Sequence, residues 1–72
     1  MVYDYSKLNG RIVEKYGTRS SFAAKMGVSE RTMSLKLNNK VSFRQDDIQK
    51  AAELLDIPIN DIQSYFFTQK VQ

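Results

Sequence analysis

The stretch FAAKMGVSERTMSLKL, residues 22–37, decides the fold because it holds two short apolar patterns on either side of a glycine. The apolar residues of its first half recur at the spacing of one helix face: Phe22, Ala23 and Met26. In the second half, Met33 and Leu37 lie four residues apart, again on one face of a helix. Gly27 permits a sharp reversal of the backbone, and Ser29 is a favourable N-cap. The stretch therefore predicts two short helices joined by a tight turn.

The rest of the chain continues the helical spacing, and it predicts an all-α fold. Five helices are expected, at about 5–16, 19–26, 29–38, 42–55 and 59–67. Ser42 and Gln45, in the segment SFRQ, fit a capping box that opens the fourth helix. In the fifth helix, Ile59, Ile62 and Phe66 are predicted to lie on one side. No repeat or linker interrupts the chain, which indicates one compact domain over residues 1–72.

The composition argues against several classes of protein. The 72 residues include no cysteine and no histidine, so the commonest general base and the commonest metal ligands are absent. We therefore expect no enzyme, no metal site and no cofactor. No apolar run approaches the roughly 18 residues of a membrane span. The sequence indicates a soluble intracellular protein with neither a membrane nor a small-molecule ligand as partner.

Charge is divided unevenly along the chain. Residues 1–45 contain nine lysines and arginines against three acidic residues, whereas residues 46–72 contain two against five. A basic first part suggests one face for a polyanion, and the acidic second part suggests another face for a different partner. The alternative is that the lysines only solubilise helix surfaces.

The central motif also resembles a known family. The run Ala23-x-x-x-Gly27-Val28-Ser29-x-x-x-Met33, followed by LNNK at 37–40, resembles the helix-turn-helix of the Cro and repressor regulators of bacteriophages. The five-helix layout is similar to the lambda-repressor-like DNA-binding domain over all but the last few residues. The segments YDYSKLNGRIVEKYGT and SERTMSLKLNNK resemble small regulators of phages and prophages of Gram-positive bacteria.

This resemblance implies a function, a partner and a location. It predicts a sequence-specific regulator of transcription that binds double-stranded DNA, a Cro-like repressor acting as a homodimer on a two-fold operator. The helix-turn-helix would span about residues 19–38, and the protein would work in the cytoplasm of a bacterial host cell. The alternative is a helix-turn-helix scaffold used as a protein-interaction module, with an antitoxin-like or anti-repressor partner.

The same resemblance implies which residues would contact DNA. The base-reading set would be Glu30, Arg31, Ser34 and Leu35. Two of these have another explanation, since Glu30 also suits the positive end of a helix dipole and Leu35 also suits packing on the fourth helix. The phosphate-contacting set would be Arg19, Lys36, Lys40 and Arg44, which outside this setting are solvated surface charges.

The C-terminal segment SYFFTQKVQ suggests a contact between copies. Tyr65 and Phe67 would point partly away from the core, and exposed aromatic rings on a terminal helix suggest a homodimer contact. The alternative is that both rings cover the first helix and Tyr3 or Tyr5 of the same chain. Residues 68–72 have no evident structural demand and are expected to be frayed.

Overall fold

The computed structural model describes residues 2–70, and these form five α-helices. They are α1 (Ser6–Tyr16), α2 (Arg19–Met26), α3 (Glu30–Leu37), α4 (Gln45–Leu54) and α5 (Ile62–Phe66), with a 3-10 turn η1 (Ile59–Asp61) before α5. The all-α prediction is confirmed. Within residues 2–70 the β-type pairing is limited to one isolated bridge between Tyr3 and Gln69. No helix in this part of the chain is long and apolar enough to cross a membrane.

The starts of α2 and α3 agree with the sequence because their caps are local. The hydroxyl of Thr18 accepts a hydrogen bond from the backbone N–H of Ser21 at 3.1 Å. The hydroxyl of Ser29 does the same for Thr32 at 3.0 Å. Between the two helices, Gly27 has a φ of +76°, a conformation that strains residues with a side chain.

The start of α4 differs from the prediction. Its N-cap is Arg44, and the backbone N–H of Arg44 donates to the carboxylate of Asp47 at 3.1 Å. The predicted capping box of Ser42 and Gln45 is therefore wrong. The acid three residues after the cap satisfies the helix start, and α4 begins three residues later than Ser42.

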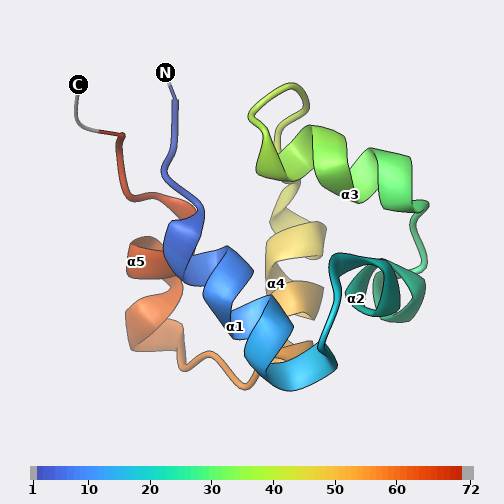
Figure 1. Ribbon diagram of the computed structural model, residues 1–72. Coiled ribbons are helices and arrows are strands. Elements are labelled where there is room, and N and C mark those ends of the chain that lie inside the picture. The colour runs from blue at the N-terminus through green and yellow to red at the C-terminus, as the bar shows by residue number, and fades with distance from the viewer. Residues whose placement is uncertain (1, 71–72) are drawn as a thin grey trace.

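The helices close around one core. In Figure 1, α1 crosses the middle of the molecule, and it packs against both α2 and α5. Helix α2 in turn packs against α3 and α4. The largest fully buried side chains come from α1, α2, α3, α5 and the C-cap of α4: Leu8, Ile12, Phe22, Met33, Phe66 and Leu55.

The two ends of the described chain lie side by side (Figure 1). The N–H of Asp4 donates to the carbonyl of Thr68 at 2.7 Å, and the N–H of Lys70 donates to the carbonyl of Val2 at 3.0 Å. Residues 68–70, which the sequence predicts to be frayed, are thus paired with the N-terminal segment. The remainder of that prediction, at 71–72, falls outside the described residues.

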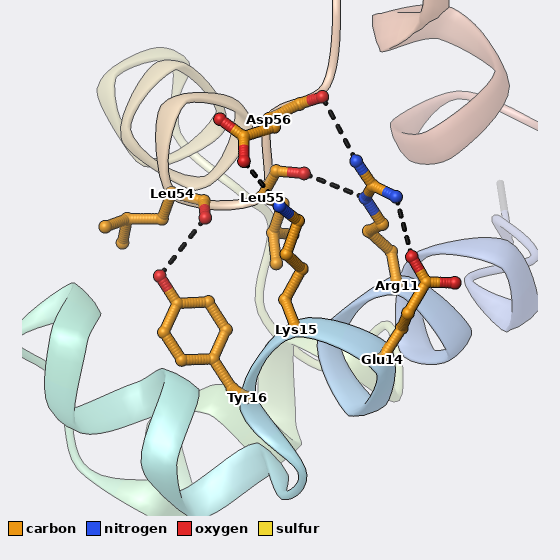
Figure 2. Close-up of polar contacts among 7 residues, drawn as sticks. All are labelled: Arg11, Glu14, Lys15, Tyr16, Leu54, Leu55 and Asp56. Atoms are coloured by element: carbon orange, nitrogen blue, oxygen red, sulfur yellow. Dashed lines mark hydrogen bonds and ion pairs between the residues drawn. The ribbon is translucent and has the colours of Figure 1, made fainter.

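The C-terminal end of α4 is held by side chains of α1 (Figure 2). Arg11 donates to the carbonyl of Leu55 at 2.8 Å and to that of Asp56 at 3.3 Å. The Tyr16 hydroxyl donates to the carbonyl of Leu54 at 3.1 Å. The last carbonyls of a helix have no partner within it and favour nearby cations. These contacts therefore fix α4 against α1.

The chain leaves α4 through a Schellman motif. Asp56 adopts the left-handed conformation with a φ of +53°, and the N–H of Ile57 donates to the carbonyl of Ala52 at 2.9 Å. This turn places Ile57 in the core. The exposed Asp56 carboxylate pairs with Lys15, whose hydrogen bond and charge lower the pKa of Asp56.

Replacement of Arg11 tests this attachment. We expect Arg11→Met to lower the free energy of unfolding by about 2 kcal/mol, because two carbonyls lose a charged donor. The control is Glu14→Gln, which removes only the exposed partner of Arg11 and should cost less than about 0.5 kcal/mol. Urea unfolding measures both, and equal losses in the two variants would contradict the assignment.

Candidate functional site

Helices α2 and α3 form the turn-linked pair that the sequence predicts. The N–H of Val28 donates to the carbonyl of Ala23 at 3.1 Å, and the side chain of Met33 is completely buried between the helices and the core. The pair is therefore a rigid scaffold. This geometry serves DNA or protein recognition equally well.

The residues predicted to read bases are only partly on the surface. Glu30 and Arg31 are exposed, whereas Ser34 and Leu35 are half-buried. The Ser34 hydroxyl accepts a hydrogen bond from the side-chain amide of Asn38 at 3.3 Å. The structure therefore brings two of the four predicted residues fully to the surface.

The residues predicted to contact phosphate divide in the same way. Arg19, Lys40 and Arg44 are exposed, and no ion pair involves them within residues 2–70. Lys36 is buried, with 6% of its surface exposed. Its ammonium group donates to the Asp47 carboxylate at 2.9 Å and to the carbonyl of Ser42 at 3.2 Å. Lys36 is thus committed inside the protein, and its predicted role at a phosphate is wrong.

The Lys36–Asp47 pair joins the end of α3 to the start of α4. Burial alone would raise the pKa of Asp47, but the hydrogen bonds from Lys36 and from the Arg44 N–H, together with their charges, lower it. The ammonium group also lies 5.7 Å from the centre of the Phe43 ring. A buried ammonium requires such a counter-charge.

The two C-terminal aromatic residues lie against the N-terminal part of the same chain. Tyr65 is half-buried, with the ammonium group of Lys7 lying 4.6 Å from the centre of its ring. Phe67 meets the ring of Tyr3 edge-on at 5.8 Å and stays 43% exposed. The structure thus matches the alternative in which these rings cover their own chain, and the homodimer contact stays a prediction.

An open apolar groove of about 860 Å³ lies between α4 and the η1–α5 segment; we call it the α4–α5 groove. Its apolar lining consists of Ile48, Ala52, Ile57, Ile59, Ile62 and Phe67. Its polar lining consists of Gln45, Gln49, Glu53 and Gln63. Sequence reasoning did not find this site.

Ile59 explains why the groove is open. The predicted fifth helix places Ile59 on one side with Ile62 and Phe66, but 87% of Ile59 is exposed whereas Phe66 is buried. The Schellman turn places Ile57 in the core, and Pro58 then starts the short η1 turn with Ile59 outside. The signal in the sequence is the crowding of three isoleucines into residues 57–62, which is more than a helix of this length buries.

Comparison with known proteins identifies the family. A family model described as "Protein of unknown function (DUF739)" matches residues 1–69. The chain belongs to this family. No curated protein matches it. Among solved structures it is similar to the solution structure of the modulator of repression (MOR) of the temperate bacteriophage TP901-1 from Lactococcus lactis. The two are 54% identical with a TM-score of 0.83, and the match covers 100% of this chain and 97% of that one.

This comparison contradicts the prediction of a Cro-like, DNA-binding repressor. The relative is by name a modulator of repression and not a repressor, and the family description assigns neither a helix-turn-helix nor Cro. The coarser part of the resemblance is confirmed, because the chain is similar over its whole length to a small regulatory protein of a bacteriophage. The DNA contacts predicted for residues such as Arg31 depended on the rejected function, and nothing in the comparison supports them.

The Lys36–Asp47 pair predicts an asymmetry between two variants. Asp47→Asn leaves a buried ammonium without its counter-charge, and we expect it to lower the free energy of unfolding by about 3 kcal/mol. Lys36→Met leaves a carboxylate that still meets solvent and the Arg44 N–H, so the expected loss is about 1 kcal/mol. Urea unfolding at neutral pH compares them, and a larger loss for Lys36→Met would refute this account of the pair.

The lowered pKa of Asp47 predicts a dependence of stability on pH. Because the pKa is lower in the folded state than its ordinary value of 3.8, the stability from Asp47 is present above that value and is lost as the pH falls through the folded-state pKa. Wild type should therefore lose more stability than Asp47→Asn between about pH 5 and about pH 2. The pKa values of Asp4 and Asp56 are also lowered, so these two groups contribute to the pH dependence of both proteins. The difference between wild type and Asp47→Asn therefore isolates the contribution of Asp47. Parallel curves for the two proteins would exclude this contribution.

Proposed function

We propose that this chain is a protein-interaction module that binds a phage repressor protein and thereby modulates repression. The observation that carries the proposal is the similarity to the TP901-1 modulator of repression, at 54% identity over the whole of this chain and nearly all of the other. Both chains thus consist of the same single fold. The proposed activity needs a binding surface and no catalytic group, so the protein is not an enzyme under this proposal.

The surface chemistry supports a protein partner. The α4–α5 groove exposes aliphatic side chains, and contiguous apolar surface on a small protein commonly marks a protein-binding site. The acidic excess of residues 46–72 is unsuited to a nucleic acid but suits a cationic protein. A repressor is such a protein, because it must neutralise DNA phosphates with lysines and arginines.

The fold supports a rigid docking partner. Helices α2 and α3 are locked to the core through Phe22 and Met33, and α4 is held at both ends by Arg11 and Asp47. Rigid partners lose little conformational entropy on association. The protein can therefore bind through a preformed surface.

Binding to the repressor is tested with the repressor encoded in the same phage or prophage genome as this chain. The full-length proteins should form a complex in size-exclusion chromatography with light scattering. Saturating amounts of this chain should also change the apparent affinity of the repressor for operator DNA by about tenfold or more, as fluorescence anisotropy would report.

Two controls make the result decisive. Met33→Asp places a carboxylate in the core and supplies an unfolded chain, which should neither bind nor change repression. The chain alone should leave the operator unbound at the concentration that saturates the repressor. Absence of a complex between the folded wild-type chain and the repressor would refute the proposal.

A further inference from the structure

We infer that the α4–α5 groove is where the repressor docks, and that it receives an apolar segment of the repressor flanked by lysine or arginine. This inference rests on the proposed function and adds the surface and the chemistry of the contact. It follows from the shape of the groove, from the charge around it, and from two rows of side chains along it, one apolar and one polar. We call these rows the apolar stripe and the polar stripe.

The apolar stripe provides the anchor. Ile48 and Ala52 lie four residues apart on α4, and Ile59 and Ile62 face them from the η1–α5 segment. Ile59 contributes almost nothing to the core, because 87% of it is exposed. Apolar grooves between helices bind amphipathic segments through a few apolar anchors. A partner that covers Ile59 would complete a cluster that this chain leaves open.

The polar stripe provides the edge. Gln45, Gln49 and Glu53 recur every four residues, so they form one row along α4 beside the apolar stripe. The two amides can donate to and accept from the backbone or side chains of a bound segment. Glu53 ends the row with a carboxylate, which calls for a donor with a positive charge.

The charge around the groove is negative. Glu53 is the one charged residue in its lining as described, and Asp46 and Asp61 adjoin the lining residues Gln45 and Ile62. None of these three acids takes part in an ion pair within residues 2–70.

The two cations of this half of the chain are engaged elsewhere. Lys50 donates to the carbonyl of Met26 at the end of α2, at 3.2 Å. Lys70 lies near Asp4 and helps to lower its pKa. The groove therefore favours a cationic partner.

The same charge disfavours a second copy of this chain. A two-fold contact through the groove would bring the Glu53 and Asp61 carboxylates of both copies towards one another, and like charges at an interface suppress association. A repressor carries the opposite charge because it binds DNA. The repressor is therefore the occupant that the groove fits.

The experiment measures the affinity of the full chain for the repressor from the same genome by isothermal titration calorimetry. Ile59→Asp should weaken binding by at least about tenfold, because it removes the apolar anchor. Glu53→Arg should weaken binding by about fivefold or more, because it reverses the charge that meets the partner's cation.

Matched controls lie on other faces of the molecule. Val13→Asp changes an aliphatic residue of α1 that is 55% exposed, and Glu30→Arg reverses an exposed acid at the start of α3. Both should bind within about twofold of wild type. All four positions are exposed, and urea unfolding verifies that each variant is folded.

Each outcome has a distinct meaning. If wild type does not bind the repressor, the proposed function itself fails. If wild type binds and Ile59→Asp and Glu53→Arg bind equally well, the groove is wrong while the proposed function stands. Loss of binding in Val13→Asp or Glu30→Arg alone would place the contact on another face. Self-association of the chain that Ile59→Asp abolishes would make a second copy the occupant and overturn the inference.

Discussion

The ion pair between the buried Lys36 and the partly exposed Asp47 sets the position of α4, on which the rest of the structure depends. An ammonium group in the interior is costly unless a carboxylate accompanies it, so the end of α3 cannot leave the start of α4. The same carboxylate oxygen accepts the N–H of Arg44, and the helix start and the ion pair thus form together. At its other end, α4 is tied to α1 by Arg11 (Figure 2). A helix held at both ends can present a face to solvent without losing its position.

Features that arise from neighbouring residues were predictable from the sequence. The caps at Thr18 and Ser29 act within three residues, so propensity alone places α2 and α3 correctly. The role of Lys36 depends instead on Asp47, eleven residues away in the next helix. A count of cations cannot separate a lysine paired in the interior from one that faces a phosphate. Because Lys36 is buried and paired with Asp47, it does not belong to the predicted set of phosphate-contacting residues.

The groove escaped prediction, and the function that the comparison favours was predicted only as the alternative to a DNA-binding repressor. Helical spacing places Ile59 on one side of a single helix with Ile62 and Phe66, but the short η1 turn breaks that spacing and leaves Ile59 outside. The helix-turn-helix geometry is present, yet the same geometry supports contact with DNA or with a protein. The motif alone does not separate these two interpretations, and similarity over the whole chain to a modulator of repression favours contact with a protein.

The isoleucines of this chain offer the most direct test of a repressor-binding groove. Of its five isoleucines, Ile48, Ile57, Ile59 and Ile62 line the α4–α5 groove, and Ile12 is completely buried in α1. Methyl NMR spectra of the full chain, recorded as the repressor is added, therefore contain four reporters and one internal reference. We predict that the four groove signals shift while that of Ile12 stays in place. Unchanged groove signals, with shifts of backbone amides confined to α2 and α3, would contradict the account.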